Sequence, residues 1–168
     1  MNTSHHSKQR QVLTPLGVLT VACSAQGLSG IWFEGQKHHP GPLQAEVDEI
    51  DPLLQQAADQ LQAYFAGKRK AFDLPLALEG TTFQQAVWAG LLKIPFGQTI
   101  SYGELAERVR APSAVRAVGA AVGHNPVSII VPCHRVIGRD GDLTGYAGGL
   151  DRKTALLHLE GITLKTDA

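Results

Sequence analysis

The sequence predicts two small domains: an α/β domain with a small antiparallel sheet and one helix, then a mostly helical, winged-helix-like domain. Apolar residues alternate within residues 18–33, as in a β-hairpin, and recur at helical spacing in residues 52–65. Two short helical patterns within residues 101–123 are separated by four residues, which is typical of a helix-turn-helix. Residues 68–80 have the pattern of an extended connector. The expected domains are therefore residues 1–78 and 79–168.

The first domain is expected to contain the hairpin and the helix. Val18–Cys23 alternates apolar and polar side chains, and after a glycine-containing turn Leu28–Phe33 forms the second strand. The helix begins after Asp51, a favourable N-cap residue, with Pro52 in the first helical position, and it ends at Gly67. Its apolar residues define its buried face: Leu54, Ala57, Ala58, Leu61, Tyr64 and Phe65.

The second domain is expected to contain four helices. Thr82 with Gln85 has the spacing of a capping box, and Ser101 with Glu104 has the same spacing. Each pair predicts the start of a helix, and residues 110–113 form the turn of the helix-turn-helix. The predicted helices are residues 82–92, 101–109, 114–123 and 151–160, and a short buried run at 127–131 leads to Cys133 on an extended strand.

The overall charge does not by itself predict nucleic-acid binding, because the formal net charge is zero. The charges are unevenly distributed, however. Residues 101–139 contain five arginines and two glutamates, a local excess of plus three (5 − 2). This excess indicates a local basic surface, with an ordinary solvated helix face as the alternative.

The cysteines and the apolar runs bear on the cellular compartment. Cys23 and Cys133 are far apart in sequence and form no disulfide framework, which favours a reducing compartment. Residues 1–11 are polar, unlike a secretory signal, and no apolar run approaches the roughly 20 residues that span a bilayer. We therefore expect a soluble, cytoplasmic protein without a membrane partner.

The third helix of the second domain has two contrasting faces. Two glycines inside a helix cost about 1 kcal/mol each relative to alanine, so they need a reason. One reason is close packing against another helix. The other is close approach to a nucleic-acid groove, which would give binding with little sequence specificity, since few base-reading side chains are present. The outward stripe is Arg116, Gly119, Ala120 and Gly123, and the stripe predicted to be core is Val115, Val118 and Val122.

Cys133 is the candidate nucleophile. His134 offers a base beside it, and Arg135 adds positive charge that should increase the thiolate fraction of an accessible thiol. On a strand, His134 would point away from the sulfur, so a bridging water could relay the proton. Glu160, at the end of the last helix, is the candidate carboxylate that orients the imidazole, because a carboxylate there is unfavourable without a partner.

Together these residues resemble the O6-alkylguanine-DNA alkyltransferases, of the bacterial, zinc-free type. The resemblance runs from about Thr81 to Gly161, and the first 80 residues are more loosely similar. It implies an RNase H-like first domain. Some relatives hold zinc there, but Cys23 lacks a second nearby cysteine, and neither His5-His6 nor His38-His39 is expected to form a physiological site. No metal and no cofactor are expected. The most specific strings are Asn125-Pro126, Val131-Pro132-Cys133-His134-Arg135-Val136 and Gly145-Tyr146-Ala147-Gly148-Gly149.

The resemblance also implies roles for single residues. Cys133 is the alkyl acceptor, His134 and Glu160 form the water-bridged relay, Tyr102 donates to N3 of the leaving guanine, and Asn125 braces the turn before the cysteine. The implied DNA-binding residues are Arg116, which fills the gap left by the extruded nucleotide, with Ala114, Gly119, Ala120, Gly123, Arg110 and Arg135. The implied base pocket consists of Val136, Tyr146, Ala147 and Gly148, together with the carbonyl of Cys133.

The implied activity is direct DNA repair. The protein would transfer an alkyl group once and irreversibly from O6-alkylguanine, and also from O4-alkylthymine, to Cys133 after the nucleotide leaves the stack. Its partner would be double-stranded DNA, and a monomer is expected, with association along DNA left open. Ala147 and Gly148 are small, which predicts tolerance of groups larger than methyl, such as benzyl. The family often has glycine where this chain has Arg110.

Three other functions fit parts of the sequence. A cysteine hydrolase would use Cys133, His134 and Glu160 as a triad and would turn over repeatedly. An alkyltransferase-like protein would bind lesions without reacting, but such proteins carry tryptophan where this chain has Cys133. A winged-helix regulator with an inert cysteine would bind DNA with sequence selectivity.

Overall fold

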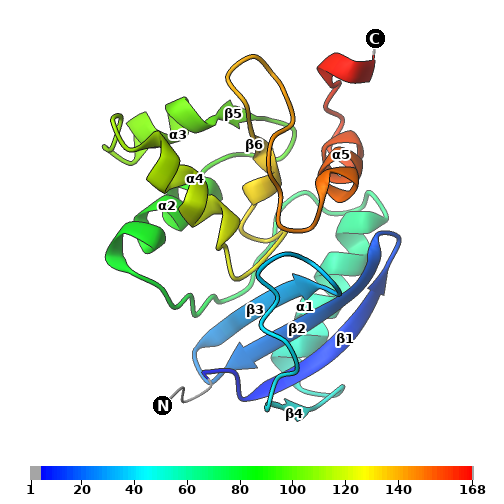
Figure 1. Cartoon of the computed structure of the whole chain (residues 1–168). Helices are drawn as coiled ribbons and strands as arrows, with labels where there is room; N and C mark the ends of the chain where they lie inside the picture. The colour runs from blue at the N-terminus through cyan, green and yellow to red at the C-terminus, as the bar shows by residue number, and fades with distance from the viewer. Residues whose placement is uncertain (1–4, 168) are drawn as a thin grey trace. The chain divides into compact units, whose positions relative to one another are not determined.

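The computed structural model describes residues 5–167 of the 168-residue chain. The chain forms two compact units that divide between Glu79 and Gly80, one residue from the predicted boundary. The division into a sheet-containing unit followed by a helical unit confirms the predicted fold class (Figure 1). Among the described helices, none combines the length and apolar character that crossing a bilayer requires.

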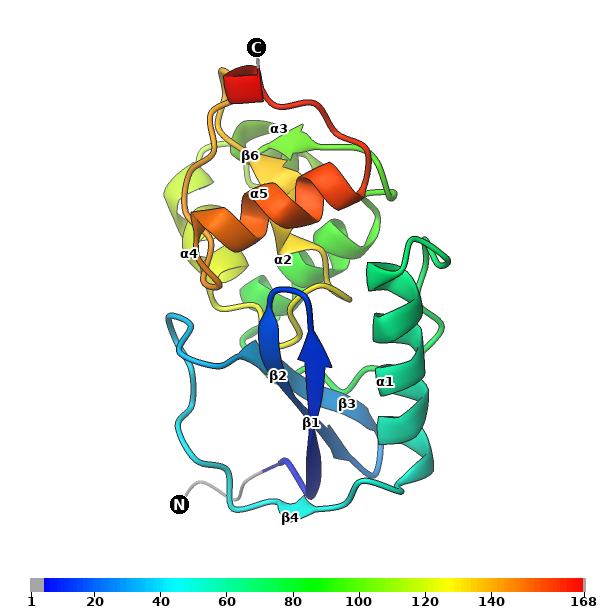
Figure 2. The same ribbon diagram turned by 90° about the vertical axis from the view of Figure 1, so that its right-hand side faces the viewer.

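The first unit is a small sheet with one long helix on one face, as the two views in Figures 1 and 2 show. The predicted hairpin is confirmed as β2 and β3, and α1 contacts β1, β2 and β3. β1 pairs antiparallel with β2, and the short β4 pairs parallel with β1. The order across the sheet is β3-β2-β1-β4. The elements are β1 (Lys8–Thr14), β2 (Gly17–Ser24), β3 (Gly27–Phe33), β4 (Glu46–Val47) and α1 (Pro52–Phe65).

Strand β1 was not predicted from the sequence. Only Val12 of its seven residues is buried, so the strand lacks the apolar alternation that identifies strands in a sequence. Its stability comes from pairing with β2 along its whole length, from Lys8 opposite Cys23 to Thr14 opposite Gly17. The parallel β4 was not predicted either, since two residues carry no periodicity.

Helix α1 begins and ends as its sequence predicts. The carboxylate of Asp51 accepts a hydrogen bond from the backbone N–H of Leu54 at 3.1 Å, and Pro52 occupies the first turn. Gly67 follows the helix with φ of 73°, a left-handed conformation that glycine adopts without strain. The residues buried along the helix are Leu54, Ala57, Ala58, Leu61 and Tyr64.

His5 and His6 each contact another residue of the first unit. His5 pairs with Glu79 at 2.7 Å, and His6 contacts the hydroxyl of Ser29 at 2.7 Å. Among residues 5–167 there is no group of three or more His, Cys, Asp or Glu side chains placed to hold a metal ion.

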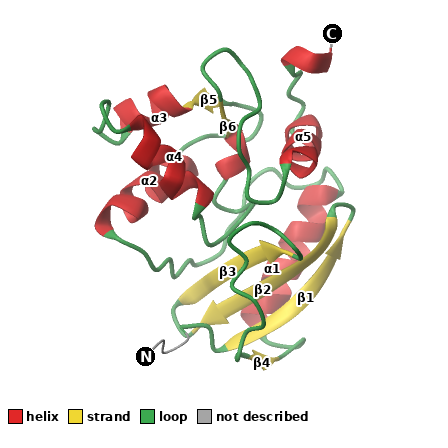
Figure 3. Cartoon of the chain, viewed as in Figure 1, coloured by secondary structure: helices red, strands yellow, loops and turns green. Residues whose placement is uncertain are grey.

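The second unit is mainly helical, and its strands β5 and β6 pair in parallel to form a two-stranded sheet (Figure 3). Its core forms where α2, α3 and α4 pack together. The buried Trp88 of α2 donates from its indole nitrogen to the carbonyl of Ala121 at 2.8 Å, which fixes α2 against α4. The elements are α2 (Thr82–Leu92), β5 (Ile100–Ser101), α3 (Tyr102–Arg108), α4 (Val115–Gly123), η1 (Cys133–Arg135), β6 (Val136–Ile137), α5 (Leu150–Leu159) and η2 (Lys165–Asp167).

The capping box of α2 lies one residue earlier than predicted. Thr81, not Thr82, is the N-cap: its hydroxyl accepts from Gln84 N–H at 3.1 Å, and the Gln84 side chain accepts from Thr81 N–H at 3.0 Å. Paired threonines and paired glutamines gave two equally spaced choices in the sequence. Burial of Val87, Trp88 and Leu91 decides between them.

Helices α3 and α4 form the predicted helix-turn-helix. Ser101 caps α3 by accepting from Glu104 N–H at 3.1 Å. Arg110, in the turn, has φ of 63°, a left-handed conformation that costs a non-glycine residue roughly 1–2 kcal/mol. Val118 and Val122 are buried as expected, but the prediction for Val115 was wrong, because this residue is 40% exposed. It is the first residue of α4, where the helix has not yet reached the core.

Candidate active site

Cys133 opens a single 3₁₀ turn, η1, and not the extended strand that the sequence predicted. The turn follows the buried run Val127–Val131 and precedes the buried Val136, and these apolar neighbours carry the cysteine into the interior. Its side chain is a free thiol and is only 5% exposed. The expectation of an accessible thiol is therefore wrong: Cys133 is buried.

Asn125 holds the turn before Cys133 from within. Its side-chain amide donates to the carbonyl of Val131 at 2.7 Å, and its side-chain oxygen accepts from Val127 N–H at 3.0 Å. Ile129, in the same turn, has φ of 74°, which is rare and strained for a β-branched residue. A strained turn persists only when its surroundings fix it, and the two hydrogen bonds of Asn125 do so.

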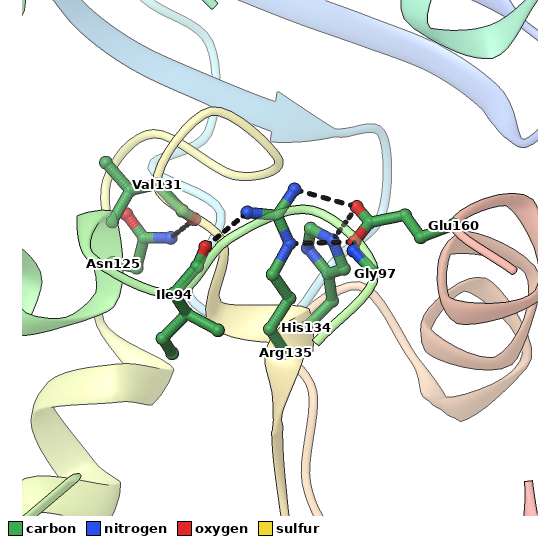
Figure 4. A network of polar contacts seen from close by, with 7 residues as sticks. All are labelled: Ile94, Gly97, Asn125, Val131, His134, Arg135 and Glu160. Atoms are coloured by element: carbon green, nitrogen blue, oxygen red, sulfur yellow. Dashed lines mark hydrogen bonds and ion pairs between the residues drawn. The ribbon is translucent and has the colours of Figure 1, made fainter. Parts of the chain in front are cut away.

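Glu160 is the centre of a buried polar network (Figure 4). It follows the last turn of α5 as its C-cap, and both His134 and Arg135 reach it from η1. The shortest contact joins His134 Nε2 to Glu160 Oε2 at 2.7 Å, and Arg135 binds both carboxylate oxygens, with Nε at 2.8 Å and Nη2 at 3.0 Å. Gly97 N–H donates to Glu160 at 3.3 Å. From the sequence, His134 was the only predicted partner of Glu160.

The position of Arg135 corrects its predicted role at the DNA surface. The side chain is 8% exposed, its guanidinium is paired with Glu160, and its Nη1 donates to the carbonyl of Ile94 at 2.6 Å. An arginine so engaged is not available to a phosphate. Three successive residues on a 3₁₀ turn point in directions about 120° apart, so η1 can aim Arg135 inward.

The protonation state of His134 follows from its partners. Burial lowers the pKa of the imidazole below its ordinary value of 6.5, with Glu160 opposing this effect. Glu160 is held ionised by Arg135 and can only accept hydrogen bonds, so Nε2 of His134 carries the proton. Nδ1 has no hydrogen-bond partner among the residues that the structure describes. The neutral ring therefore presents Nδ1 as a base.

The thiol of Cys133 experiences opposing influences. Burial raises its pKa above the ordinary value, and this is the largest effect. The side-chain amide of Asn125 and the charge of Lys153 act in the other direction. The positive charge expected from Arg135 is neutralised by Glu160, so the sequence-based account of how the thiol ionises named the wrong cation.

Lys153 is the functional candidate that sequence reasoning missed. It lies in α5, is fully buried, and its ammonium donates to three carbonyls: Val136 at 2.6 Å, Thr144 at 3.0 Å and Gly145 at 3.3 Å. A signal was present in the sequence, because Lys153 shares a helical stripe with Leu156, Leu157 and Glu160. A lysine on the apolar face of a helix requires an explanation.

Two of the residues predicted to contact the base, Tyr102 and Val136, lie beside this lysine. The hydroxyl of Tyr102 donates to the carbonyl of Thr144 at 3.1 Å, which ties α3 to the loop before α5. Burial raises the pKa of the Tyr102 phenol, so it remains a hydrogen-bond donor. Val136 is buried in β6, and Gly148 is buried where Gly149 N–H closes a turn on Tyr146 at 2.9 Å. Ala147 is half-buried between them.

Helix α4 presents the surface that the sequence assigned to DNA. Arg116 and Ala120 are exposed, Ala114, Gly119 and Gly123 are half-buried, and Arg110 is exposed in the preceding turn. A methyl group added at Gly123 would meet nothing within 4 Å, and one at Gly119 would make only ordinary contact with the Tyr102 ring at 3.9 Å. Packing within the described chain therefore does not require either glycine, and close helix packing does not explain them.

Comparison with protein families covers most of the chain. Residues 11–78 match the ribonuclease-like domain of 6-O-methylguanine DNA methyltransferase, and residues 82–162 match the DNA-binding domain of the same family. A methylated-DNA–protein-cysteine methyltransferase of Mycobacterium tuberculosis is 51% identical over 151 residues, covering 90% of each chain. One from Haemophilus influenzae is 45% identical over 150 residues, covering 89% of this chain and 83% of the relative.

Solved structures show the same fold. The crystal structure of Mycobacterium tuberculosis OGT in complex with DNA is 50% identical and superposes with a TM-score of 0.85, covering 91% of this chain and 92% of that one. An O6-methylguanine DNA methyltransferase from Methanococcus jannaschii is 26% identical, with a TM-score of 0.66, covering 92% and 95% of the two chains.

Proposed function

The chain belongs to the 6-O-methylguanine DNA methyltransferase family, and from this premise we propose that it repairs DNA by transferring the alkyl group of O6-alkylguanine to Cys133. The main support for assigning this reaction to particular residues is the order of the side chains at η1. A free thiol is followed directly by a neutral imidazole, whose Nε2 is held by Glu160 and whose Nδ1 can accept a proton.

The thiol proton leaves first. A water molecule between the sulfur and Nδ1 passes the proton to His134, and Glu160 stabilises the imidazolium that forms. Arg135 keeps Glu160 ionised and in place through its two contacts. Because burial holds the pKa of His134 below 6.5, the ring is neutral and able to accept a proton at neutral pH. The relay fails as the pH falls far enough to protonate Nδ1.

The transfer itself is a displacement at carbon. The sulfur forms a bond to the alkyl carbon while the bond from that carbon to O6 breaks, and the electron pair of that bond passes to the purine. Tyr102 moves its hydroxyl from Thr144 to N3 of the base and stabilises the developing charge. The proton held by His134 returns through solvent, so neutral guanine leaves. The product at Cys133 is a thioether, which water does not hydrolyse, so each molecule acts once.

The proposed partner is double-stranded DNA that contains the lesion, read with little sequence specificity. The target nucleotide must rotate out of the stack at a cost of a few kcal/mol, and the exposed Arg116 of α4 would fill the gap. The glycines of α4 support this proposal, since no contact within the described chain explains them. We further propose that the protein acts as a monomer in the cytoplasm, where Cys133 stays reduced. O4-alkylthymine and larger alkyl groups are proposed as additional substrates.

Intact mass spectrometry tests the proposal. After incubation with a duplex containing O6-methylguanine, we expect the mass to increase by one methyl group, located at Cys133, with no second addition. Cys133→Ser should show no increase, and the matched control Cys23→Ser should react like the wild type. Repeated turnover without a mass change would instead indicate a hydrolase, and sequence-selective binding without any change would indicate a regulator.

Glycine substitutions on α4 test the DNA surface. Gly119→Ala and Gly123→Ala should each raise the free energy of unfolding by about 1 kcal/mol, because alanine is the better helix former and has room here. The same changes should weaken binding to duplex DNA, because the added methyl groups keep the backbone away from the groove. Urea denaturation and fluorescence anisotropy measure the two effects. Unchanged DNA affinity in both variants would contradict this surface.

A further inference from the structure

Arg110 is a strained and exposed residue in the turn between α3 and α4 (Figure 1). Its φ of 63° is left-handed, and among the described non-glycine residues only His38 and Ile129 share a positive φ. Within residues 5–167 its guanidinium makes no hydrogen bond or ion pair with another residue. The backbone conformation of Arg110 is therefore unfavourable, and no side-chain contact within the described chain compensates for it.

The turn requires the left-handed conformation but does not require arginine. Ala111 N–H donates to the carbonyl of Ala106 at 2.8 Å, and Arg110 N–H donates to the carbonyl of Glu107 at 3.0 Å. These two hydrogen bonds form a Schellman motif, in which the left-handed residue after the helix is usually glycine. Glycine at residue 110 would keep both hydrogen bonds without strain, because all the donors and acceptors are backbone groups.

Stabilisation of α3 does not account for the arginine. A cation near the C-terminus of a helix interacts favourably with the helix dipole, but Arg108, in the last turn of α3, already supplies one. The dipole interaction is also weaker than the cost of a left-handed side chain. Glu104 and Glu107 are exposed on α3, yet neither forms an ion pair with Arg110. A use for this charge must therefore be sought outside the described chain.

We propose that Arg110 binds a phosphate of the DNA backbone and that the chain keeps this arginine although it lowers the stability of the fold. This inference rests on the function proposed above, in which duplex DNA contacts α4. Arg110 lies in the turn that leads to Ala114, the N-cap of α4, and so precedes the helix that carries Arg116. A guanidinium has a planar set of N–H donors that matches a phosphate group. Phosphate contacts carry no sequence information, which suits a protein that binds DNA with little sequence specificity.

The two neighbouring exposed arginines differ from Arg110 in their backbone conformation. Arg108 lies within α3 and Arg116 within α4, where arginine is a favourable residue and φ is not positive. At those two residues a substitution that removes the charge relieves no backbone strain. At residue 110 the same kind of substitution removes the charge and the strain together, so it should change DNA binding and stability in opposite directions.

The first test measures the salt dependence of binding to an undamaged duplex by fluorescence anisotropy. Each phosphate contact contributes about 0.9 to the slope of log affinity against log salt concentration. Between about 50 and 200 mM salt, Arg110→Gly should therefore lose roughly 3.5-fold less affinity than the wild type loses. Its affinity at low salt should be weaker than that of the wild type. Arg110→Lys keeps the charge and should keep the wild-type slope. An unchanged slope in Arg110→Gly would overturn the proposal.

The second test measures the thermal stability of the same proteins. Arg110→Gly and Arg110→Asn should each raise Tm by roughly 2–4 °C, because glycine and asparagine adopt the left-handed conformation at lower cost. Arg110→Lys should leave Tm unchanged. If neither Arg110→Gly nor Arg110→Asn is more stable than the wild type, arginine does not lower the stability of the fold and the proposal is overturned.

Arg108→Gln is the matched control, because it removes an exposed positive charge two residues away without relieving strain. It should not raise Tm, and it should change the salt slope less than Arg110→Gly does. Equal changes in slope would indicate a general effect of charge and would overturn a specific contact at Arg110. Binding to undamaged DNA involves no reaction at Cys133. A wild type that binds the duplex but accepts no methyl group would therefore count against the proposed function alone.

Discussion

The two cysteines of this chain have almost the same solvent exposure, yet the strongest charge acting on each has the opposite sign. Cys23 in β2 is 4% exposed and Cys133 in η1 is 5% exposed, and burial is the main cause that raises the pKa of each thiol. Cys23 lies against a carboxylate, with its sulfur 3.9 Å from Asp51, and this charge raises its pKa further. Cys133 lies near an amide and a buried ammonium, which lower its pKa. Solvent exposure therefore does not distinguish the two cysteines, but the neighbouring charges do.

The largest expected effect comes from removing the carboxylate that balances the Cys133 site. Glu160→Gln should lower the free energy of unfolding by about 3–5 kcal/mol, because Arg135 would remain buried without a counter-charge. Methyl transfer from DNA should be lost, since the His134 imidazolium would no longer be stabilised. Urea denaturation and intact mass measure these outcomes. A variant as stable as the wild type would show that Arg135 does not need Glu160 as its counter-charge.

A smaller effect is expected from Asn125→Ala. This change removes both hydrogen bonds that hold the turn before Cys133, and each buried group left without a partner costs about 1–3 kcal/mol. The thiol pKa should also rise, so the reaction with iodoacetamide at neutral pH should slow. Gln36→Ala is the matched control: it removes a similarly buried amide that accepts from Phe33 N–H in the first unit. It should lower stability but leave Cys133 reactivity unchanged.

The smallest effect tests the comparison from the side of Cys23. Asp51→Asn removes the adjacent negative charge but keeps the helix cap, because asparagine caps as well as aspartate. The pKa of Cys23 should fall slightly, with a modest rise in its labelling by iodoacetamide, measured by peptide mass. Burial, the larger cause, is unchanged, so Cys23 should remain less reactive than Cys133. A Cys23 that became the faster thiol would show that one charge alone decides reactivity.

The comparison also shows what local sequence could and could not predict about the site. Cys133, His134 and Glu160 were singled out by residue type, by adjacency and by the unfavourable place of a carboxylate at a helix end, and the structure brings His134 and Glu160 to 2.7 Å. The direction of Arg135 was not accessible in this way. From the sequence alone, an arginine beside a candidate nucleophile is expected to be an exposed cation. The fold shows instead that Glu160, at the end of α5, faces it.

The fold shows the same division. The N-cap, first-turn proline, buried face and glycine end of helix α1 are all local features of its sequence, and the prediction was correct except that Phe65 is only half-buried. Strand β1 was not predicted, and the α2 cap was predicted one residue too late, because both depend on partners elsewhere in the chain. Val115 follows the same rule, because periodicity places it on a helical face but does not say how far the core extends.

By itself, the sequence determined the two-domain fold class, most of the helices with their local start and stop signals and the family, and it singled out Cys133 as the candidate nucleophile. These depend on interactions within a few residues or on motifs that are contiguous in the chain. Only the tertiary structure decided that Cys133 is buried, that Arg135 pairs with Glu160, and that Lys153 is buried with its ammonium on backbone carbonyls. Electrostatic roles depend on distance and burial, and both are set by residues that are remote in sequence and meet only when the chain has folded.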